Sequence, residues 1–188
     1  MENRESRVST SFEVRAEDDA VTVEGYAAVF DEDTVIGGQW MERIAPGAFT
    51  NAIGRDDVTF LINHEGLPLA RTRSGTLELF EDQRGLRMRA SLDMRDPDVR
   101  SIVPKMQRGD LDKMSFAFIP TRQKWKDVDG KDLPRRTIEE AELYDVSIVT
   151  TPAYSGTEIG LRSLENFRKS QRKSQAPRRI RMKDRLQK

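Results

Sequence analysis

The chain has 188 residues, enough for one domain with a sizeable core and a tail, and its 32 basic and 32 acidic side chains balance. It has no cysteine and a single histidine, which excludes disulfides and thiolate chemistry and leads us to expect no metal site and no cofactor. No apolar run approaches the roughly 20 residues that cross a bilayer, and the charged start predicts no secretory signal, so we expect no membrane partner.

The first 19 residues are predicted to be a loose segment with one candidate strand, around Phe12 to Arg15. A second strand-like run follows from Val21 to Phe30. A short helix is predicted from Ala45 to Gly54, because proline suits the first turn of a helix and glycine suits its end.

The only histidine, His64, follows a strand-like run that begins at Val58. Because side chains alternate between the two faces of a strand, Val58, Phe60, Ile62 and His64 are predicted to share one face. A lone histidine on an apolar face is more often a packed core residue than a catalytic base. Both interpretations stay open on this segment alone.

A hairpin is predicted for residues 76–81 and 85–93, because apolar and polar side chains alternate clearly in its second arm. The next element is a helix from Asp96, which can cap it, to about Gly109. Pro104 lies inside this run and is expected to kink the helix or split it.

Residues 113–119 form another strand-like run, with a serine between bulky side chains. The side chains of Met114, Phe116 and Phe118 are predicted to face the core. Ser115 then points the other way, where smaller neighbours leave room for a peptide at its hydroxyl.

The last predicted strand runs from about Leu143 to Thr150 and brings acidic side chains with it. Asp145, Glu142 on the opposite face, and Glu140 are all candidates to orient a histidine, whereas Glu65 is predicted to point away from His64. A base, a hydroxyl and an acid on three different strands are the parts of a serine hydrolase.

About seven strands with two interspersed helices predict a small α+β domain over residues 20–162. We expect a closed or nearly closed, mainly antiparallel β-barrel of six to seven strands, flanked by helices. Residues 163–188 contain ten basic and two acidic side chains, which predicts a tail that is disordered or folds as a helix on a partner. Phe167 is its only aromatic residue, so docking or removal by self-cleavage is favoured over specific nucleic-acid binding.

Six short motifs follow one another in the first 154 residues. They are EGYAAVF at 24–30, ERIAPGAF at 42–49, NHE at 63–65, PLART at 68–72, MSFAF at 114–118 and DVSIVTTPAY at 145–154. In this order, the motifs resemble those of the tailed-phage prohead serine proteases, a family related to herpesvirus assemblin. Together they cover roughly residues 20–162, and the series is far more specific than any one motif.

The resemblance implies an assemblin-like barrel and a protease that works inside the assembling procapsid, in the host cytoplasm. Its implied substrate is the scaffolding segment of the major capsid protein, and often the protease itself. The portal and a second copy of the chain are further candidate partners.

The resemblance also favours particular site residues. Ser115 would attack the substrate, His64 would accept its proton, and Asp145 would be the third member, with Glu142 as runner-up. The herpesvirus relatives use a second histidine in that place, which this chain lacks, so a carboxylate must serve here. Ala70 stands where the family pattern leads us to expect glycine, which would alter the loop after His64.

Three points stay open at this stage. The oxyanion hole is not visible in the sequence, and Arg71 is its only side-chain candidate. A catalytically silent scaffold or assembly module of the same fold is the main alternative function. A nucleic-acid adaptor that binds through the basic tail is a weaker one.

Overall fold

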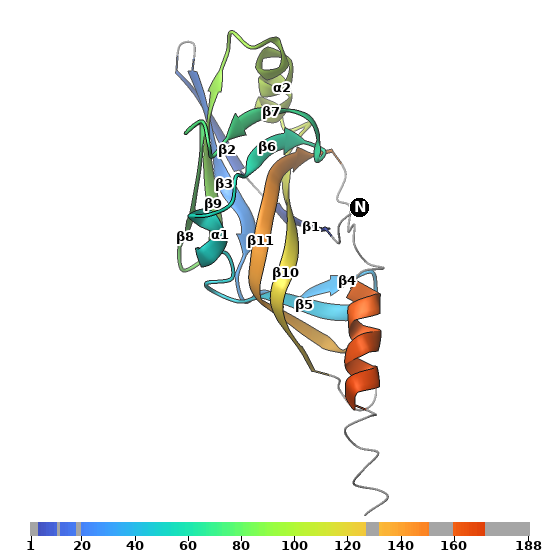
Figure 1. The fold of residues 1–188 in the computed structure, drawn as a ribbon. Helices are drawn as coiled ribbons and strands as arrows, with labels where there is room; N and C mark the ends of the chain where they lie inside the picture. The colour runs from blue at the N-terminus through green and yellow to red at the C-terminus, as the bar shows by residue number, and fades with distance from the viewer. Residues whose placement is uncertain (1–3, 11, 18–19, 127–131, 151–159, 172–188) are drawn as a thin grey trace, which may run out of the picture.

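The computed structural model describes residues 4–10, 12–17, 20–126, 132–150 and 160–171 (Figure 1). Strands dominate these residues and lie in two sheets. The strands are β1 (Glu5–Thr10), β2 (Phe12–Glu17), β3 (Ala20–Val29), β4 (Thr34–Ile36), β5 (Trp40–Ile44), β6 (Thr59–Ile62), β7 (Glu65–Arg71), β8 (Leu77–Glu81), β9 (Gly85–Asp93), β10 (Lys113–Lys126) and β11 (Arg135–Val149). The helices are α1 (Thr50–Ile53), α2 (Pro97–Gln107) and one of residues 160–171.

The larger sheet is organised around the two longest strands. β10 pairs antiparallel with β11 on one side and with β1 on the other. The far edge of β11 pairs in parallel with two strands in succession, β5 near its start and β6 near its end. β4 then adds to β5, and β7 adds to β6. β5, which precedes α1, and β6, which follows it, thus both pair with the same edge of β11.

The smaller sheet has the order β2-β3-β9-β8 and lies on one side of the β10–β11 pair (Figure 1). Its strand β3 contacts both β1 and β10, and a core of apolar side chains fills the space between the sheets. Among its largest fully buried members are Phe49, Phe60, Phe116, Phe118 and Met88. The fold is therefore a mixed α+β structure made mostly of strands, as the sequence predicts.

Closure of the strands into a barrel is not confirmed. In the part of the chain that the structure describes, β1, β4 and β7 are end strands of one sheet and β2 and β8 of the other, and no strand of one sheet pairs with a strand of the other. The consecutive strands β1 and β2 belong to different sheets, so the chain changes sheet instead of continuing a ladder. The described strands thus form two sheets, and the barrel stays a prediction.

Local signals account for several elements. The predicted hairpin is present as β8 and β9, and the expected apolar face of β9 is buried. Asp96 caps α2 by accepting a hydrogen bond from the backbone of Asp98 at 2.8 Å. Pro104 does not split α2, which runs from Pro97 to Gln107, and a kink at Pro104, the other predicted outcome, stays a prediction. Its side chain lies on the exposed face of α2, where water can satisfy the carbonyl that its missing N–H leaves free.

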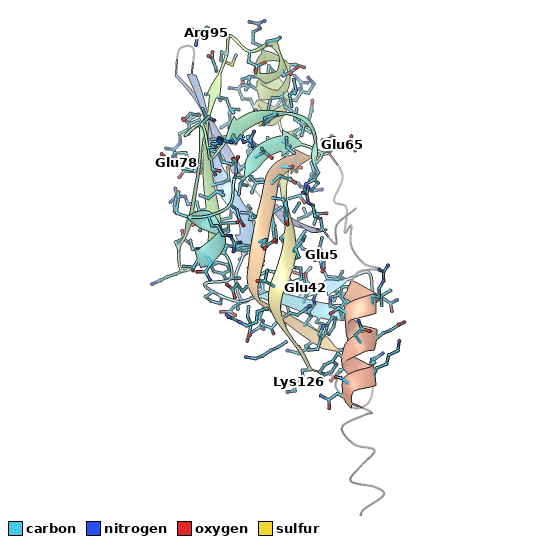
Figure 2. All side chains as sticks on the ribbon, viewed as in Figure 1. Glu5, Glu42, Glu65, Glu78, Arg95 and Lys126 are labelled. Carbon is cyan, nitrogen blue, oxygen red and sulfur yellow. The ribbon has the colours of Figure 1, made fainter. Side chains whose placement is uncertain are left out.

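The N-terminal strand β1 departs most from the prediction, which expected the first residues to be loose. Glu5 and Arg7 are buried and join Glu42 of β5 and Arg136 of β11 in a cluster of two acids and two arginines. Glu5 and Glu42 are labelled beside the long strands in Figure 2. Arg136 donates to Glu5 at 2.6 and 2.7 Å and to Glu42 at 2.9 Å, while Arg7 donates to both acids. The two carboxylates and the two guanidiniums balance each other's charge and hydrogen-bond to one another, which allows these side chains of β1 to be buried.

This charge cluster makes the stability of the fold sensitive to acid. Burial acts to raise the pKa of Glu42, but Arg7 and Arg136 outweigh it and the net pKa is lowered. A lowered pKa in the folded state means that the unfolded chain binds the proton more tightly. The stabilisation from Glu42 is therefore present above about pH 4.3 and is lost as the pH falls below that value.

We expect Glu42→Gln to destabilise the protein most at neutral pH. The difference in the free energy of unfolding between this variant and the wild type should narrow by up to about 1.4 kcal/mol for each pH unit below about 4. Urea unfolding from neutral to acidic pH measures this, with substitution of the exposed Glu78 of β8 by glutamine as the control (Figure 2). A difference that stays constant over the whole pH range would contradict the linkage.

The helix of residues 160–171 packs against the larger sheet. A Cβ added at Gly160 would lie 2.5 Å from the Trp40 ring, so the glycine allows this close approach. The Trp125 indole also donates to the Ser163 hydroxyl at 3.0 Å. The predicted boundary between residues 162 and 163 falls inside this helix, and the rest of the predicted tail, residues 172–188, lies outside the described residues.

Candidate active site

Ser115 lies in the middle of the larger sheet, on β10. Its neighbours across the ladders are Val8 of β1 and Ser147 of β11. Met114, Phe116 and Phe118 are buried in the core, as their alternation predicts. The open space predicted beside the Ser115 hydroxyl is absent, however, because β1 lies there and leaves Ser115 only 1% exposed.

His64 lies in a two-residue turn between β6 and β7. Ile62 pairs with Glu65, so Asn63 and His64 alone connect the strands. Both have positive φ, 52° and 62°, as the type I′ turn of a tight hairpin requires. The prediction that His64 continues the strand is therefore wrong, because β6 ends at Ile62 and strand alternation does not set the direction of the imidazole.

Asn63 holds this turn to the end of β11. Its side-chain oxygen accepts hydrogen bonds from the Thr150 backbone N–H at 3.0 Å and from the Thr150 hydroxyl at 3.3 Å. Its own N–H donates to the Ile148 carbonyl at 2.9 Å. The turn that carries His64 is thus fixed against the strand that carries Asp145.

The structure brings His64, Ser115 and Asp145 into one hydrogen-bonded series. His64 Nδ1 lies 2.6 Å from Asp145 Oδ1, and His64 Nε2 lies 2.8 Å from Ser115 Oγ. Asp145 is buried, whereas the His64 side chain is 24% exposed. These distances allow a proton to pass between the hydroxyl and the imidazole while the carboxylate holds the ring.

The other acid candidates lie elsewhere. Glu142 accepts a hydrogen bond from the Tyr144 hydroxyl at 2.9 Å, and Glu140 accepts one from Arg122 at 3.0 Å. Glu65 is exposed at the start of β7 (Figure 2). Of the acids considered from the sequence, Asp145 is the one hydrogen-bonded to His64 in the described part of the chain.

Two expectations concern the segment after His64. Ala70 lies within β7, buried opposite Phe60, and not in the turn that presents His64. The expected effect of this alanine on the loop after His64 stays a prediction. Arg71 binds Asp57 through two hydrogen bonds of 2.8 and 2.7 Å, so its guanidinium is already engaged away from Ser115.

Sequence reasoning missed Ser147, which lies next to all three residues. The Ser147 hydroxyl donates to Asp145 Oδ1 at 2.7 Å and lies 3.3 Å from His64 Nδ1. Ser147 is fully buried and stands directly opposite Ser115 on β11. A detectable signal was its spacing of two from Asp145, which puts both side chains on one face of the strand.

We expect Ser147→Ala to lower kcat of any Ser115-dependent reaction by roughly 10-fold to 100-fold. A hydrogen bond to a charged group contributes about 1.5–3 kcal/mol, and without it the Asp145 carboxylate is free to rotate away from His64. The pH–rate profile and kcat, measured with Ser91→Ala on β9 as the control, test this. An unchanged kcat and pH profile in Ser147→Ala would contradict a role in holding Asp145.

Within the described residues, no group of three or more histidine, cysteine, aspartate or glutamate side chains is placed to hold a metal ion. No helix in the same part of the chain is long and apolar enough to cross a membrane.

A hydroxyl, an imidazole and a carboxylate in hydrogen-bonded series are the arrangement that serine hydrolases use. The family model described as caudovirus prohead serine protease matches residues 10–170, so the chain belongs to that family. The chain is also similar to the prohead protease of Enterobacteria phage HK97, with 29% identity over 143 residues. That match covers 69% of this chain and 55% of the relative, so it spans little more than half of the relative's length. No solved structure matches the chain significantly.

Proposed function

We propose that the chain is a serine endopeptidase in which Ser115 is the nucleophile, His64 the general base and Asp145 the orienting acid. The observation that carries this proposal is the continuous series from Ser115 Oγ through the His64 ring to Asp145, with contacts of 2.8 and 2.6 Å. Family membership supports the reaction class.

The proposed mechanism follows from these positions. Ser115 Oγ attacks the carbonyl carbon of a peptide bond, and its proton passes to His64 Nε2. Asp145 stabilises the imidazolium and keeps Nε2 directed at the serine. His64 then gives the proton to the leaving amine, and a water molecule, activated by the same imidazole, releases the acid product from Ser115.

The proposed setting is the assembling procapsid in the host cytoplasm. There the enzyme would remove the scaffolding segment of the major capsid protein and would also cut itself. The name of the HK97 relative, a prohead protease, supports this setting. The portal and a second copy of the chain remain proposed partners.

Intact-mass analysis of this chain co-expressed with the major capsid protein of its phage tests the proposal. Wild type should give defined fragments, and Ser115→Ala and His64→Ala should give none. Ser91→Ala, an exposed serine in the other sheet, should cut like the wild type. The fragment ends then identify the cleaved bonds.

Uncut capsid protein in all samples, under conditions in which shells form, would remove the protease proposal. A catalytically silent assembly module would then be the better explanation. That function predicts that Ser115→Ala still supports shell assembly and that truncation of the basic tail does not.

A further inference from the structure

The catalytic hydroxyl is covered by a strand of the same chain. Val8 of β1 pairs with Ser115, and Ser115 Oγ donates to the Arg7 carbonyl at 2.8 Å. That carbonyl belongs to the peptide bond between Arg7 and Val8. A peptide in extended conformation therefore already lies on the nucleophile, with one of its carbonyls in hydrogen-bond contact.

This placement is the one expected for a substrate. Proteins commonly bind extended peptides by adding them as a strand to a sheet edge, and pockets for alternate side chains then give specificity. β1 is an edge strand of its sheet and pairs only with β10 among the described strands. Removal of β1 would leave the β10 edge, with Ser115 in it, ready to accept another strand.

The side chains of Glu5 and Arg7 on β1 enter a charged slot built by other elements. Glu42 of β5 binds Arg7 through both carboxylate oxygens, and its side chain is only 3% exposed. Arg136 of β11 binds Glu5 in the same paired way and is fully buried. The slot thus offers a carboxylate to the residue just before the peptide bond that Ser115 contacts. It offers a guanidinium to the residue two positions before that one.

The slot also has space beside β1. A cavity of about 250 Å³ lies against Arg7 and Glu42, lined further by Val8, Glu32, Thr34 and Phe116. A second cavity of about 250 Å³ lies at the other end of the cluster, lined by Glu5 and Arg136 among others. A peptide with other side chains can therefore be accommodated along the same path.

The hydrogen bonds of the Ser115 hydroxyl are those of the resting enzyme, before a substrate binds. Its hydroxyl carries one proton and lies within reach of two acceptors, the Arg7 carbonyl and His64 Nε2. A proton donated to the carbonyl is not available for transfer to the imidazole. β1 thus both covers the nucleophile and competes for the proton that catalysis must move.

We propose that the slot of β1 is the substrate-binding groove and that β1 occupies it as an intramolecular pseudosubstrate. Glu42 then selects substrates with arginine or lysine immediately before the cleaved bond. This inference rests on the proposed protease function. It adds the location of the groove, the residue that determines specificity and the segment that must leave before a substrate enters.

The selectivity is tested with quenched fluorescent peptides of the sequence of residues 4–10, Arg-Glu-Ser-Arg-Val-Ser-Thr. A second peptide carries leucine, and a third lysine, in place of the arginine that corresponds to Arg7. The full-length chain should cut after the central arginine or lysine. It should cut the leucine peptide at least about 30-fold more slowly in kcat/KM, which corresponds to about 2 kcal/mol.

Variants assign this preference to Glu42. Glu42→Gln should reduce the ratio between the arginine and leucine peptides to within a few-fold. Glu65→Gln, an exposed acid beside His64, is the control for general attraction of basic peptides and should keep the full ratio. If Glu42→Gln fails to fold, the comparison of peptides on the wild type still decides the selectivity.

Hydrogen exchange tests whether β1 leaves the groove when a peptide binds. In the full-length Ser115→Ala chain, the amides of residues 5–10 should lose protection when the arginine peptide is added at millimolar concentration, and should keep it with the leucine peptide. Unchanged protection with both peptides would show that β1 is a permanent strand of the fold and would overturn the pseudosubstrate.

Cleavage of unfolded β-casein separates the two proposals. If casein is cut in a Ser115-dependent way but the arginine and leucine peptides are cut equally, the assignment of the groove is wrong, whereas the proposed protease function is supported. If neither casein nor any peptide is cut in a Ser115-dependent way, the proposed function falls and this inference falls with it.

Discussion

Replacement of Ser115 by alanine, or of His64 by alanine, should lower kcat for peptide cleavage by about a million-fold. Ser115 Oγ and His64 Nε2 lie 2.8 Å apart and would act in the same proton transfer, so the loss of either removes the same reaction path. Residues that act as a unit are strongly non-additive, and the double variant should be hardly slower than either single variant.

Single-turnover kinetics on a cleavable peptide measure this, with circular dichroism to show that each variant is folded. A residual rate of about a thousand-fold over the uncatalysed reaction is expected, because the rest of the site still binds substrate. A double variant slower than both single variants by the product of their effects would contradict the coupling of Ser115 and His64.

Replacement of Arg136 by methionine should be the most damaging change to stability, at about 3–5 kcal/mol. Arg136 is completely buried and donates to both Glu5 and Glu42. Without it, two buried carboxylates share only Arg7, and an uncompensated charge remains inside the protein. Because a small domain has only about 5–15 kcal/mol in total, we expect a large fall in the urea midpoint.

Arg122→Met is the matched control on the neighbouring strand. Arg122 also pairs with two acids, Glu139 and Glu140, but its side chain is 62% exposed. Exposed ion pairs contribute about 0–1 kcal/mol, so this variant should unfold close to the wild type. Equal effects of the two substitutions would mean that burial does not decide the strength of the cluster.

Local patterns in the sequence were sufficient for much of the fold. The alternation in residues 86–92 predicted β9, and the aspartate–proline pair at 96–97 predicted the start of α2. These elements depend on interactions within a few residues, which the sequence displays directly. Pro104 shows the limit, because its effect depends on which face of α2 meets solvent.

The strand β1 could not be predicted in this way. Glu5 and Arg7 read as solvated charges, and their burial depends on Glu42 and Arg136, which lie 35 residues beyond Arg7 and 131 residues beyond Glu5. Pairing at such distances in sequence is a property of the finished fold. For the same reason, the sequence did not show that Ser115 is covered.

The three residues named for the site do meet, although one of the arguments for them was faulty. His64 reaches Ser115 and Asp145 from a turn with positive φ, and not from the face of a strand. Motif resemblance carried the choice of Asp145, and pattern reasoning alone left Glu142 open. Ser147 was missed because a small residue in a buried strand is easily taken as packing.

The origin of the site in segments far apart along the chain has a consequence for synthesis of the protein. His64 is 51 residues from Ser115 and 81 residues from Asp145 along the chain. Its position depends on β6 pairing with residues 145–148 of β11, which are synthesised after both His64 and Ser115. A chain that ends before residue 145 therefore lacks both Asp145 and the ladder that positions His64, so the hydrogen-bonded series forms only after that part of β11 has been synthesised.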